Sequence, residues 1–368
     1  MIVITSLLYC SLFAFTLLYL QNSVNGADEV FETDIHRGLC GLIAATRVSE
    51  ALGTTTQWQC NTDGTLISEP CGAGDPLLIW EMTKCEDDTL RELDLNTVPI
   101  YGTIPTAIAY LNTLTKLVLT SNCMTGTIPT HLGVLSHLSE LYLNFNSLNG
   151  TFPSEIGGMD KLTLMRVEIN SLTGTLPPTL VDLVSIQTLY MFNNSFSGNL
   201  PTAFPQSLTL MNLQNNWLNG TLATSLSHLT NCKMLVLSEN SFTQSIPTFF
   251  GNIVNNFIFL FFDSNDLTGT IPSSLFKITN LRYLRADYNY LTGQIPTLIG
   301  IFTKATYVSL NNNRFTGTIP TEFNELTNLD TLRLDNNNIT GPLPDGMFVK
   351  EKLFLEHIQL RDNKLTGS

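Results

Sequence analysis

The side chains that could carry out chemistry are few and scattered along the sequence. Five histidines occur, at His36, His131, His137, His228 and His357, and none lies at a spacing typical of metal ligands. The sequence contains no nucleophile elbow, no glycine-rich phosphate loop, no His-Glu-x-x-His pair and no kinase catalytic loop. We therefore expect no catalytic residues, no metal site and no cofactor in this chain.

The charge balance excludes some classes of partner. The 368 residues include 18 Lys and Arg against 31 Asp and Glu, a formal net charge of −13. Nucleic-acid binding needs a basic surface, so this class is excluded. Charged residues make up 13% of the chain, about half of the roughly 25% usual in soluble domains. The hydrophobic share of 43% is large enough for a substantial core, which excludes general disorder.

The first 26 residues read as a targeting segment. No charged side chain occurs from Ile2 to Leu20, and a short polar stretch follows to Gly26. This pattern is typical of a secretory signal peptide. Because roughly 20 apolar residues span a bilayer, an uncleaved signal anchor is the alternative.

The cysteines fit an exported protein. Four of the seven cluster near the start of the mature chain, at Cys40, Cys60, Cys71 and Cys85. In a secretory context they predict two disulfides, for which three pairings are possible. A zinc site is the rival reading, but the CxxC spacing is absent. Cys232 occupies a core position and is predicted to be a buried thiol, whereas Cys123 follows a turn and is predicted to be accessible. Four glycosylation sequons also fit export: Asn149, Asn193, Asn219 and Asn338.

An internal repeat dominates the rest of the chain. Its first half reads LxxLxLxxN, and its second half is a Thr-Gly-Thr-Ile-Pro block or a variant of it. The closing asparagines are mostly 24 residues apart, at Asn122, Asn146, Asn170, Asn194, Asn216, Asn240, Asn265, Asn289, Asn313, Asn337 and Asn363. One earlier unit has Val98 in place of the asparagine, so we count about twelve repeats. Gln244 replaces the repeat glycine in one unit.

The repeat predicts a solenoid. Alternating leucines form a short strand with one buried face, and stacked units bury that face in a continuous parallel sheet. The asparagine amide is expected to bond the backbone of its own turn and of the next unit. The predicted fold is an α/β solenoid with a parallel sheet on its concave face. Residues 27–89 precede it as an N-terminal cap, in which Ile35, Leu39, Leu42, Ile43 and Leu52 have helical spacing.

The motif resembles the plant-type leucine-rich repeat family, whose 24-residue unit contains LxGxIP. The resemblance covers about residues 90–368, and the threonine-rich form of the motif is most similar to algal and protist versions. The cap is similar to the plant-type cap through Trp58, Pro70-Cys71 and the spacing of Trp80 and Cys85, although Met82 and Thr83 depart from it. The resemblance implies a Cys71–Cys85 disulfide, which leaves Cys40 with Cys60. The sequence stops inside a unit at Ser368, so we expect a fragment of a longer chain.

The repeat geometry locates a candidate binding surface. Side chains between and just after the strand leucines are predicted to point outward, and aromatic and arginine residues gather among them. Such residues dominate binding hot spots. The predicted ligand-binding residues are Tyr142, Phe145, Arg166, Tyr190, Phe192, Phe259, Phe261, Tyr283, Arg285, Tyr288, Tyr307 and Arg333. A neighbouring outward column contains Glu168, Asp263, Asp287 and Asp335.

The expected function is therefore recognition rather than catalysis. Members of the family that the repeat resembles include ectodomains of receptor-like proteins and receptor kinases, and the polygalacturonase-inhibiting proteins of the cell wall. The resemblance implies an extracellular or cell-surface module that binds a protein or peptide, as in a receptor. The alternatives are an extracellular structural or adhesion protein and a secreted inhibitor of wall-degrading hydrolases. The sequence does not identify the partner.

Overall fold

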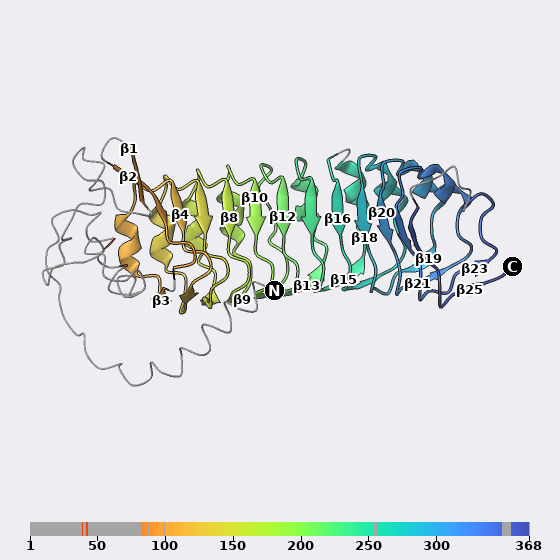
Figure 1. Ribbon diagram of the computed structural model, residues 1–368, viewed down its shortest axis with the longest axis horizontal. Helices are drawn as coiled ribbons and strands as arrows, with labels where there is room; N and C mark the ends of the chain where they lie inside the picture. Colours follow the sequence, from red (N-terminus) through yellow and green to blue (C-terminus); the bar gives the residue numbers. More distant parts are fainter. Residues whose placement is uncertain are drawn as a thin grey trace, which may run out of the picture. The chain divides into compact units, whose positions relative to one another are not determined.

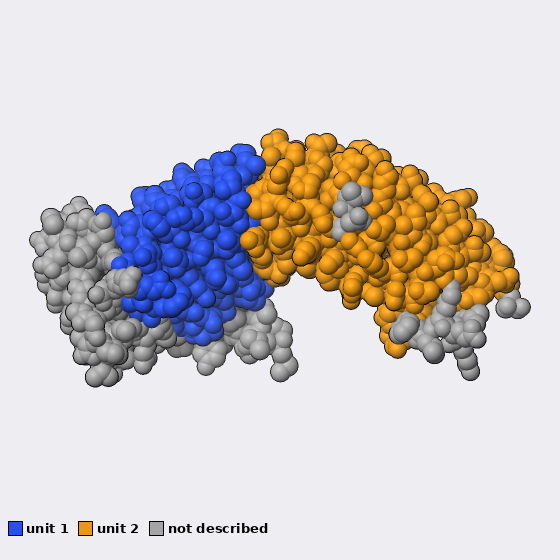
Figure 2. All heavy atoms as spheres, turned by 90° about the horizontal axis from the view of Figure 1, so that it is seen from above, with its two compact units in different colours: residues 1–186 blue, residues 187–368 orange. Residues whose placement is uncertain are grey.

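The computed structural model describes residues 39, 42, 83–86, 89–98, 100–253, 256–347 and 355–367. The chain divides into two compact units, residues 1–186 and residues 187–368, which are coloured blue and orange in Figure 2. Both units are built from the same repeat. The predicted signal segment and most of the predicted cap lie outside the described residues.

Each unit contributes short strands to a large sheet, and in Figure 1 the strands of each unit stand in chain order. In unit 1 these are β1 (Thr83–Glu86), β2 (Thr89–Asp94), β4 (Lys116–Val118), β6 (Glu140–Tyr142) and β8 (Leu164–Arg166). In unit 2 they are β10 (Thr188–Tyr190), β12 (Leu210–Asn212), β14 (Met234–Val236), β16 (Phe259–Phe261), β18 (Tyr283–Arg285), β20 (Tyr307–Ser309), β22 (Thr331–Arg333) and β24 (His357–Gln359). β1 pairs antiparallel with β2, whereas the pairs from β2–β4 onward, such as β4–β6 in unit 1 and β16–β18 in unit 2, are parallel. The predicted parallel sheet is confirmed.

A second row of shorter strands follows the asparagine turns. In unit 1 it contains β3 (Tyr101–Gly102), β5 (Cys123–Met124), β7 (Asn149–Thr151) and β9 (Ser171–Gly174). In unit 2 it contains β11 (Ser195–Gly198), β13 (Trp217–Thr221), β15 (Ser241–Ser245), β17 (Asp266–Thr268), β19 (Thr292–Gln294), β21 (Arg314–Thr316), β23 (Thr340–Gly341) and β25 (Lys364–Leu365). The sequence did not predict this second row as strands.

After the repeat proline, or Ala223 in one repeat, the chain turns through short 3-10 helices rather than α-helices. They are η4 (Thr106–Tyr110), η5 (Thr130–Val134), η6 (Ser154–Gly158) and η7 (Pro178–Asp182) in unit 1. Unit 2 has η8 (Thr224–His228), η9 (Thr248–Asn252), η10 (Ser273–Lys277), η11 (Thr297–Ile301) and η12 (Thr321–Glu325). Proline fixes φ near the value that starts such a turn and donates no hydrogen bond, which explains its place directly before the helix. In the cap, Leu39 and Leu42 are helical and buried, as the predicted helix requires.

The core of each unit lies between the sheet and the 3-10 turns. The repeat leucines, such as Leu117, Leu141 and Leu284, are at most 1% exposed. Burying one such side chain contributes about 1.5–3 kcal/mol. In unit 2 phenylalanines enlarge this core, and the ring of Phe250 lies 5.3 Å from that of Phe262. Every repeat therefore depends on its neighbours for burial.

The asparagine at the end of each repeat satisfies the backbone of two repeats at once. The Nδ2 of Asn289 donates to the carbonyl oxygens of Ala286 (3.3 Å) and Asp287 (3.0 Å) in its own repeat. It also donates to Phe262 O (3.1 Å) of the preceding repeat, and its Oδ1 accepts the amide of Leu267 (2.9 Å) there. Asn289 is 6% exposed, so water cannot replace these bonds. The predicted role of the ladder asparagine is confirmed.

The residue before each ladder asparagine adopts a left-handed conformation, and most repeats place a small polar residue there. Phe145, Ile169 and Tyr288 are the large exceptions, with φ of 55°, 56° and 51°. Large side chains rarely take this conformation, so these three positions are strained. They lie on the turn after the strand. Phe145 and Tyr288 were predicted as binding residues, and they therefore belong to the turn beside the strands rather than to the strands themselves.

Both its backbone conformation and the space beside it require a glycine in the Thr-Gly-Thr block. Gly293 has φ +79°, and a β-carbon there would lie 2.8 Å from Cγ2 of Thr270 in the preceding repeat. The threonine methyl therefore fills the space that the glycine leaves. Gln244, which replaces this glycine, adopts φ 68° and so accepts a conformation that costs a side-chain-bearing residue about 1–2 kcal/mol.

The cysteines differ from prediction at one position. Cys232 is free and fully buried, as predicted, and burial raises the pKa of its thiol to about 12. Cys85 is disulfide-bonded, and so is Cys123, for which an accessible thiol was predicted. The sequence did not place Cys123 among the expected disulfide cysteines, because a free thiol and a bonded one look alike in sequence. The predicted pairs involve Cys40, Cys60 and Cys71, which lie outside the described residues.

The ladder can be tested by replacing Asn289 with aspartate. Asn289→Asp keeps the acceptor oxygen but removes the donors to three buried carbonyl oxygens and buries a charge. Each unsatisfied buried group costs about 1–3 kcal/mol, so we expect a loss of roughly 3 kcal/mol or more in the free energy of unfolding. Urea unfolding measures this. The control is Asn338→Asp, which adds the same charge at an exposed asparagine; an equal loss in both variants would contradict the ladder's role.

Candidate ligand-binding face

The side chains of the large sheet that point away from the core form what we call the strand face of each unit. In unit 2 an aromatic column crosses three neighbouring strands at their first residue. The rings of Phe259 and Tyr283 stack with centroids 4.7 Å apart, and those of Tyr283 and Tyr307 with centroids 6.3 Å apart. The parallel register places these residues directly beside one another. Three consecutive repeats thus form one half-buried aromatic strip.

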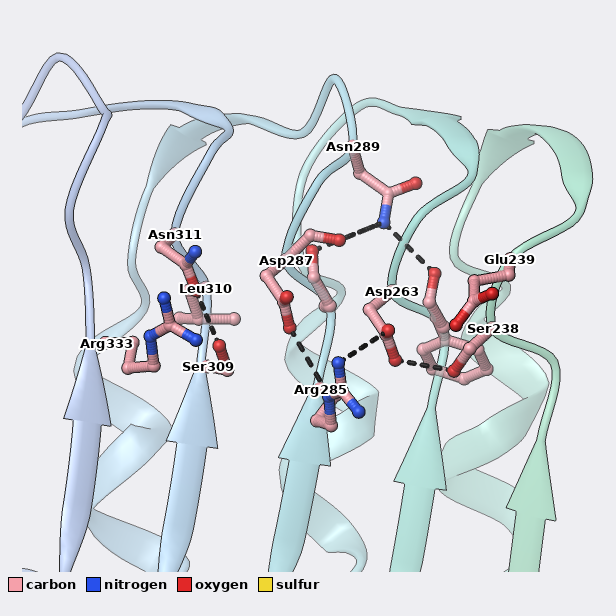
Figure 3. A network of polar contacts seen from close by, with 12 residues as sticks. Ser238, Glu239, Asp263, Arg285, Asp287, Asn289, Ser309, Leu310, Asn311 and Arg333 are labelled. Atoms are coloured by element: carbon pink, nitrogen blue, oxygen red, sulfur yellow. Dashed lines mark hydrogen bonds and ion pairs between the residues drawn. The ribbon is translucent and has the colours of Figure 1, made fainter. Parts of the chain in front are cut away.

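Beside this strip, Arg285 lies at the centre of a polar network (Figure 3). Its Nη2 is 2.8 Å from Oδ2 of Asp263, and its Nε is 3.7 Å from Oδ1 of Asp287. Its guanidinium also lies 5.5 Å from the ring centroid of Phe261. Two carboxylates and a ring therefore fix the direction of a side chain that remains 37% exposed. A fixed, partly exposed guanidinium can donate to a ligand at little further cost in entropy.

The acidic members of the outward column are covered by neighbouring arginines and are not exposed to solvent. Glu168, Asp263, Asp287 and Asp335 are at most 2% exposed. They lie at the strand end, where an arginine two residues earlier covers each of Glu168, Asp287 and Asp335 and where Arg285 of the next repeat covers Asp263. The alternation of side chains along a strand predicts on which face of the sheet a residue lies. It does not predict that a long neighbouring side chain will bury that residue.

Burial raises the pKa of three of these carboxyl groups above the ordinary range. For Asp263, burial outweighs the hydrogen bond from Ser238 Oγ (2.5 Å) and the charge of Arg285, while Asp287 adds to the rise. Burial likewise raises the pKa of Asp287 against the charges of Arg285 and Arg333 and the hydroxyl of Ser309, and that of Glu168 against Arg166. Ionising these buried carboxyl groups of the strand face therefore costs free energy.

Four polar atoms in this part of unit 2 are buried without a hydrogen-bond partner among the described residues. They are Arg285 Nε, Asp287 Oδ1, Asn311 Nδ2 and Asp335 Oδ1. The Oδ1 of Asn311 accepts a hydrogen bond from Ser309 Oγ at 2.6 Å, so only its amide nitrogen lacks a partner. An unmade bond to a buried polar group costs about 1–3 kcal/mol. Three of these atoms lie in ion pairs that are longer than a hydrogen bond, because Arg285 Nε is 3.7 Å from Asp287 Oδ1 and Asp335 Oδ1 is 3.9 Å from Arg333 Nε.

Arg333 extends the network by two strands. Its Nε donates to Oε1 of Gln359 (3.1 Å) and lies 3.9 Å from Oδ1 of Asp335. The pKa of Arg333 is raised: burial lowers it, but a hydrogen bond with Tyr307 and the charge of Asp335 outweigh this effect. The hydrogen bond joins the aromatic column to the polar network. The sequence singled out the arginines and aromatics but not Ser238 and Asn311, whose small polar side chains carry no signal of their own.

Unit 1 has a smaller cluster on its own strand face. The hydroxyl of Tyr142 donates to Oε2 of Glu140 (3.0 Å), and Lys116 lies 5.7 Å from the centroid of the Tyr142 ring. Burial, followed by Glu140, raises the pKa of Tyr142. One repeat further on, Arg166 donates from Nε to Oε1 of the buried Glu168 (2.8 Å). Two of the predicted residues, Tyr142 and Arg166, are thus neighbours in register.

The remaining predicted residues do not all join these clusters. Tyr190 and Phe192 contact each other edge to face at 6.0 Å in unit 2. Tyr288 is 53% exposed on its turn, and Phe145 lies on the corresponding turn of unit 1. A groove of about 680 Å³ in unit 1 runs along the 3-10 turns past His131, Pro153 and Pro178 and contains none of the predicted residues. In the described part of the chain, no group of three or more metal-binding side chains gathers.

Comparison with known proteins identifies the architecture. Residues 137–159, 185–206, 304–326 and 328–348 match the family model described as Leucine Rich Repeat. A TDR receptor structure superposes with a TM-score of 0.65 at 29% identity over 75% of this chain, and PEPR1-AtPEP1 with 0.73 at 25% identity over 90%. The fold is a leucine-rich repeat solenoid. No curated protein matches the sequence.

The two receptors are longer than this leucine-rich repeat chain, which covers 52% and 49% of their lengths. A plant ice-binding protein has the same fold, with a TM-score of 0.61 at 22% identity, and here 96% of that chain is covered. The receptor structures and this chain thus share the solenoid fold. Among the described residues, no helix combines the length and hydropathy that a membrane crossing needs.

The buried carboxyl groups predict a pH dependence. A raised pKa means that the folded state binds the proton more tightly than the unfolded state. The associated stability is present below the ordinary carboxyl pKa of about 4 and is lost as pH rises through the raised pKa. Asp263→Asn is neutral at all pH values, so its unfolding free energy relative to wild type should increase from pH 4 to pH 7.

Urea unfolding of both proteins across this range provides the measurement. The groups that face Asp263 are Ser238, Arg285 and Asp287, and the same measurement on Ser238→Ala shows whether the hydroxyl contributes. Asp266→Asn, at an exposed position of β17, serves as the charge-matched control. A relative stability that fell with rising pH would show that the Arg285 ion pair, and not burial, dominates.

Proposed function

We propose that this chain is an extracellular recognition module of the plant-type, 24-residue repeat class, and that it binds a protein or peptide on its strand face. The observation that carries the proposal is the strip formed by Phe259, Tyr283 and Tyr307 beside the fixed Arg285. Aromatic residues supply contact area at low entropic cost, and arginine supplies directional donors. The two receptor structures, one named with AtPEP1, support recognition as the role of such a fold.

The proposal includes a receptor-like ectodomain in signalling, at the cell surface or secreted. It rests on the leader-like residues 1–26, the clustered cysteines and the similarity to receptors that this chain matches over about half of their length. An extracellular adhesion protein and a secreted hydrolase inhibitor remain the alternatives. They would use the same face with a wall polymer or an enzyme as partner.

The polar network beside the strip favours a peptide over a simple anion as the ligand. Within it, Asp263, Asp287 and Asp335 carry three negative charges and Arg285 and Arg333 two positive ones, so the guanidinium groups are already neutralised. The guanidinium of Arg285 nevertheless stays 37% exposed beside the aromatic rings, so it can still donate to a ligand. A ligand that presents both donors and acceptors, as a peptide does, matches this network better than a simple anion.

A binding screen followed by substitution tests the proposal. The full chain is immobilised and screened against secreted peptides and proteins, wall hydrolases and wall polysaccharides. For a protein or peptide hit, Tyr283→Ala and Tyr307→Ala should each weaken binding by about tenfold or more, the usual effect of a hot-spot residue. Tyr142→Ala, Tyr190→Ala and Phe192→Ala test the other predicted residues in the same way.

The matched control is Leu298→Ala with Ile301→Ala, which removes exposed apolar side chains from η11 of the same unit. This variant should bind as wild type does. Loss of binding in the control, with full binding in the Tyr283 and Tyr307 variants, would contradict the proposal. Hits confined to polysaccharides would favour the adhesion alternative, and hits confined to hydrolases would favour the inhibitor.

A further inference from the structure

Trp217 is the most exposed large hydrophobic side chain in the described residues, at 67%. It begins β13, whose burial alternates so that Leu218 is buried while Trp217, Asn219 and Thr221 are exposed. Side chains at alternate positions of a strand point to the same side. The indole, the Asn219 amide and the Thr221 hydroxyl therefore share one face of the second row of strands. An exposed indole offers a flat apolar face with one polar N–H to whatever lies beside it.

The same strand carries a modification signal. Asn219-Gly220-Thr221 is an N-glycosylation sequon, and the side chain of Asn219 forms no hydrogen bond with the described residues. By contrast, the Oδ1 of Asn193, in another sequon, accepts a hydrogen bond from Asn215 Nδ2 at 2.8 Å. The Asn219 amide is therefore accessible and unengaged, and it lies beside the tryptophan on the exposed side of β13.

The neighbouring strands leave room above the indole. Trp217 pairs with Ser197 of β11, and Asn219 pairs with Ser241 of β15. Both neighbours are small, and Ser241 is exposed. Residues two apart on a strand are separated by about 6.6 Å, so a sugar attached to Asn219 can reach across to the indole.

We propose that Asn219 carries an N-linked glycan whose first N-acetylglucosamine packs against the indole of Trp217. In the modification, Nδ2 of Asn219 attacks the anomeric carbon of a lipid-diphosphate oligosaccharide. A C–N bond forms, the lipid diphosphate leaves with the electrons of the broken C–O bond, and the amide loses one proton. The C–H groups of the sugar then meet the negative face of the indole. The inference rests on the proposed extracellular location.

The other sequons serve as internal controls because they lack this geometry. The residue two positions before the asparagine is Ser147 for Asn149, Asn336 for Asn338 and the buried Met191 for Asn193. Asn149 and Asn338 are exposed like Asn219. Only Asn219 among the four sequons has an aromatic residue at this position, so only its sugar should contact a ring.

The test is a spectrum of the glycan itself. The full chain is secreted from a eukaryotic host supplied with N-acetylglucosamine ¹³C-labelled in the acetyl methyl group, and an endoglycosidase trims each glycan to one sugar. We expect one acetyl methyl resonance shifted upfield by the indole ring current. It should disappear in Asn219→Gln and move to the unshifted position in Trp217→Ala. Trp217→Phe, with a weaker ring current, should leave a smaller shift and shows that the strand stays folded.

Two results would overturn the proposal. One is an unmodified Asn219 in peptide mass spectra of the secreted protein. The other is an occupied Asn219 whose methyl resonance coincides with those of Asn149 and Asn338 in wild type. Neither measurement involves a ligand, so failure of the glycan contact leaves the binding proposal intact. A chain that is secreted and glycosylated but binds nothing on its strand face would contradict only the proposed function.

Discussion

The side-chain amide of the ladder asparagine is the interaction on which the rest of the structure depends. In most repeats it closes the turn after the strand and joins that turn to the preceding repeat, as Asn265 does through Leu237 O (3.0 Å) and Phe242 N (2.9 Å). The buried backbone at this turn has no regular partner of its own, so without the amide it would be left unsatisfied. The turn, in turn, fixes where the large strand ends and where the second row of strands begins.

Because the turn and the core hold the repeat together, the outward positions of the strands are free to vary. Unit 2 uses this freedom for a stacked aromatic column and for arginines braced by buried carboxylates. Bracing has a cost, since burial penalises each charge, and only part of the penalty is offset by Arg285 and Arg333. The free energy spent on burying these charges is better explained by a role in recognition than by a role in stability.

The sequence was sufficient for the periodic features. The repeat asparagines, the parallel sheet and the buried Cys232 follow from spacing, because every repeat imposes the same contacts. Features that depend on one neighbour could not be read in this way. Asp263 is buried by Arg285 of the next repeat, and Tyr288 occupies a strained turn position that most repeats fill with a polar residue. The exposure of Trp217 likewise depends on the small residues that pair with its strand, and the disulfide of Cys123 on a distant part of the chain.

Native-state hydrogen exchange of the amides that bond to the ladder asparagines tests the central claim most directly. The amides of Leu267, Leu291 and Phe315 each donate to an asparagine Oδ1 of the following repeat at 2.9 Å. If the ladder holds adjacent repeats together, these amides exchange as slowly as the strand amides of Leu284 and Val308. Exchange as fast as that of an exposed turn amide would contradict the account, because the repeats would then be joined by their apolar core alone.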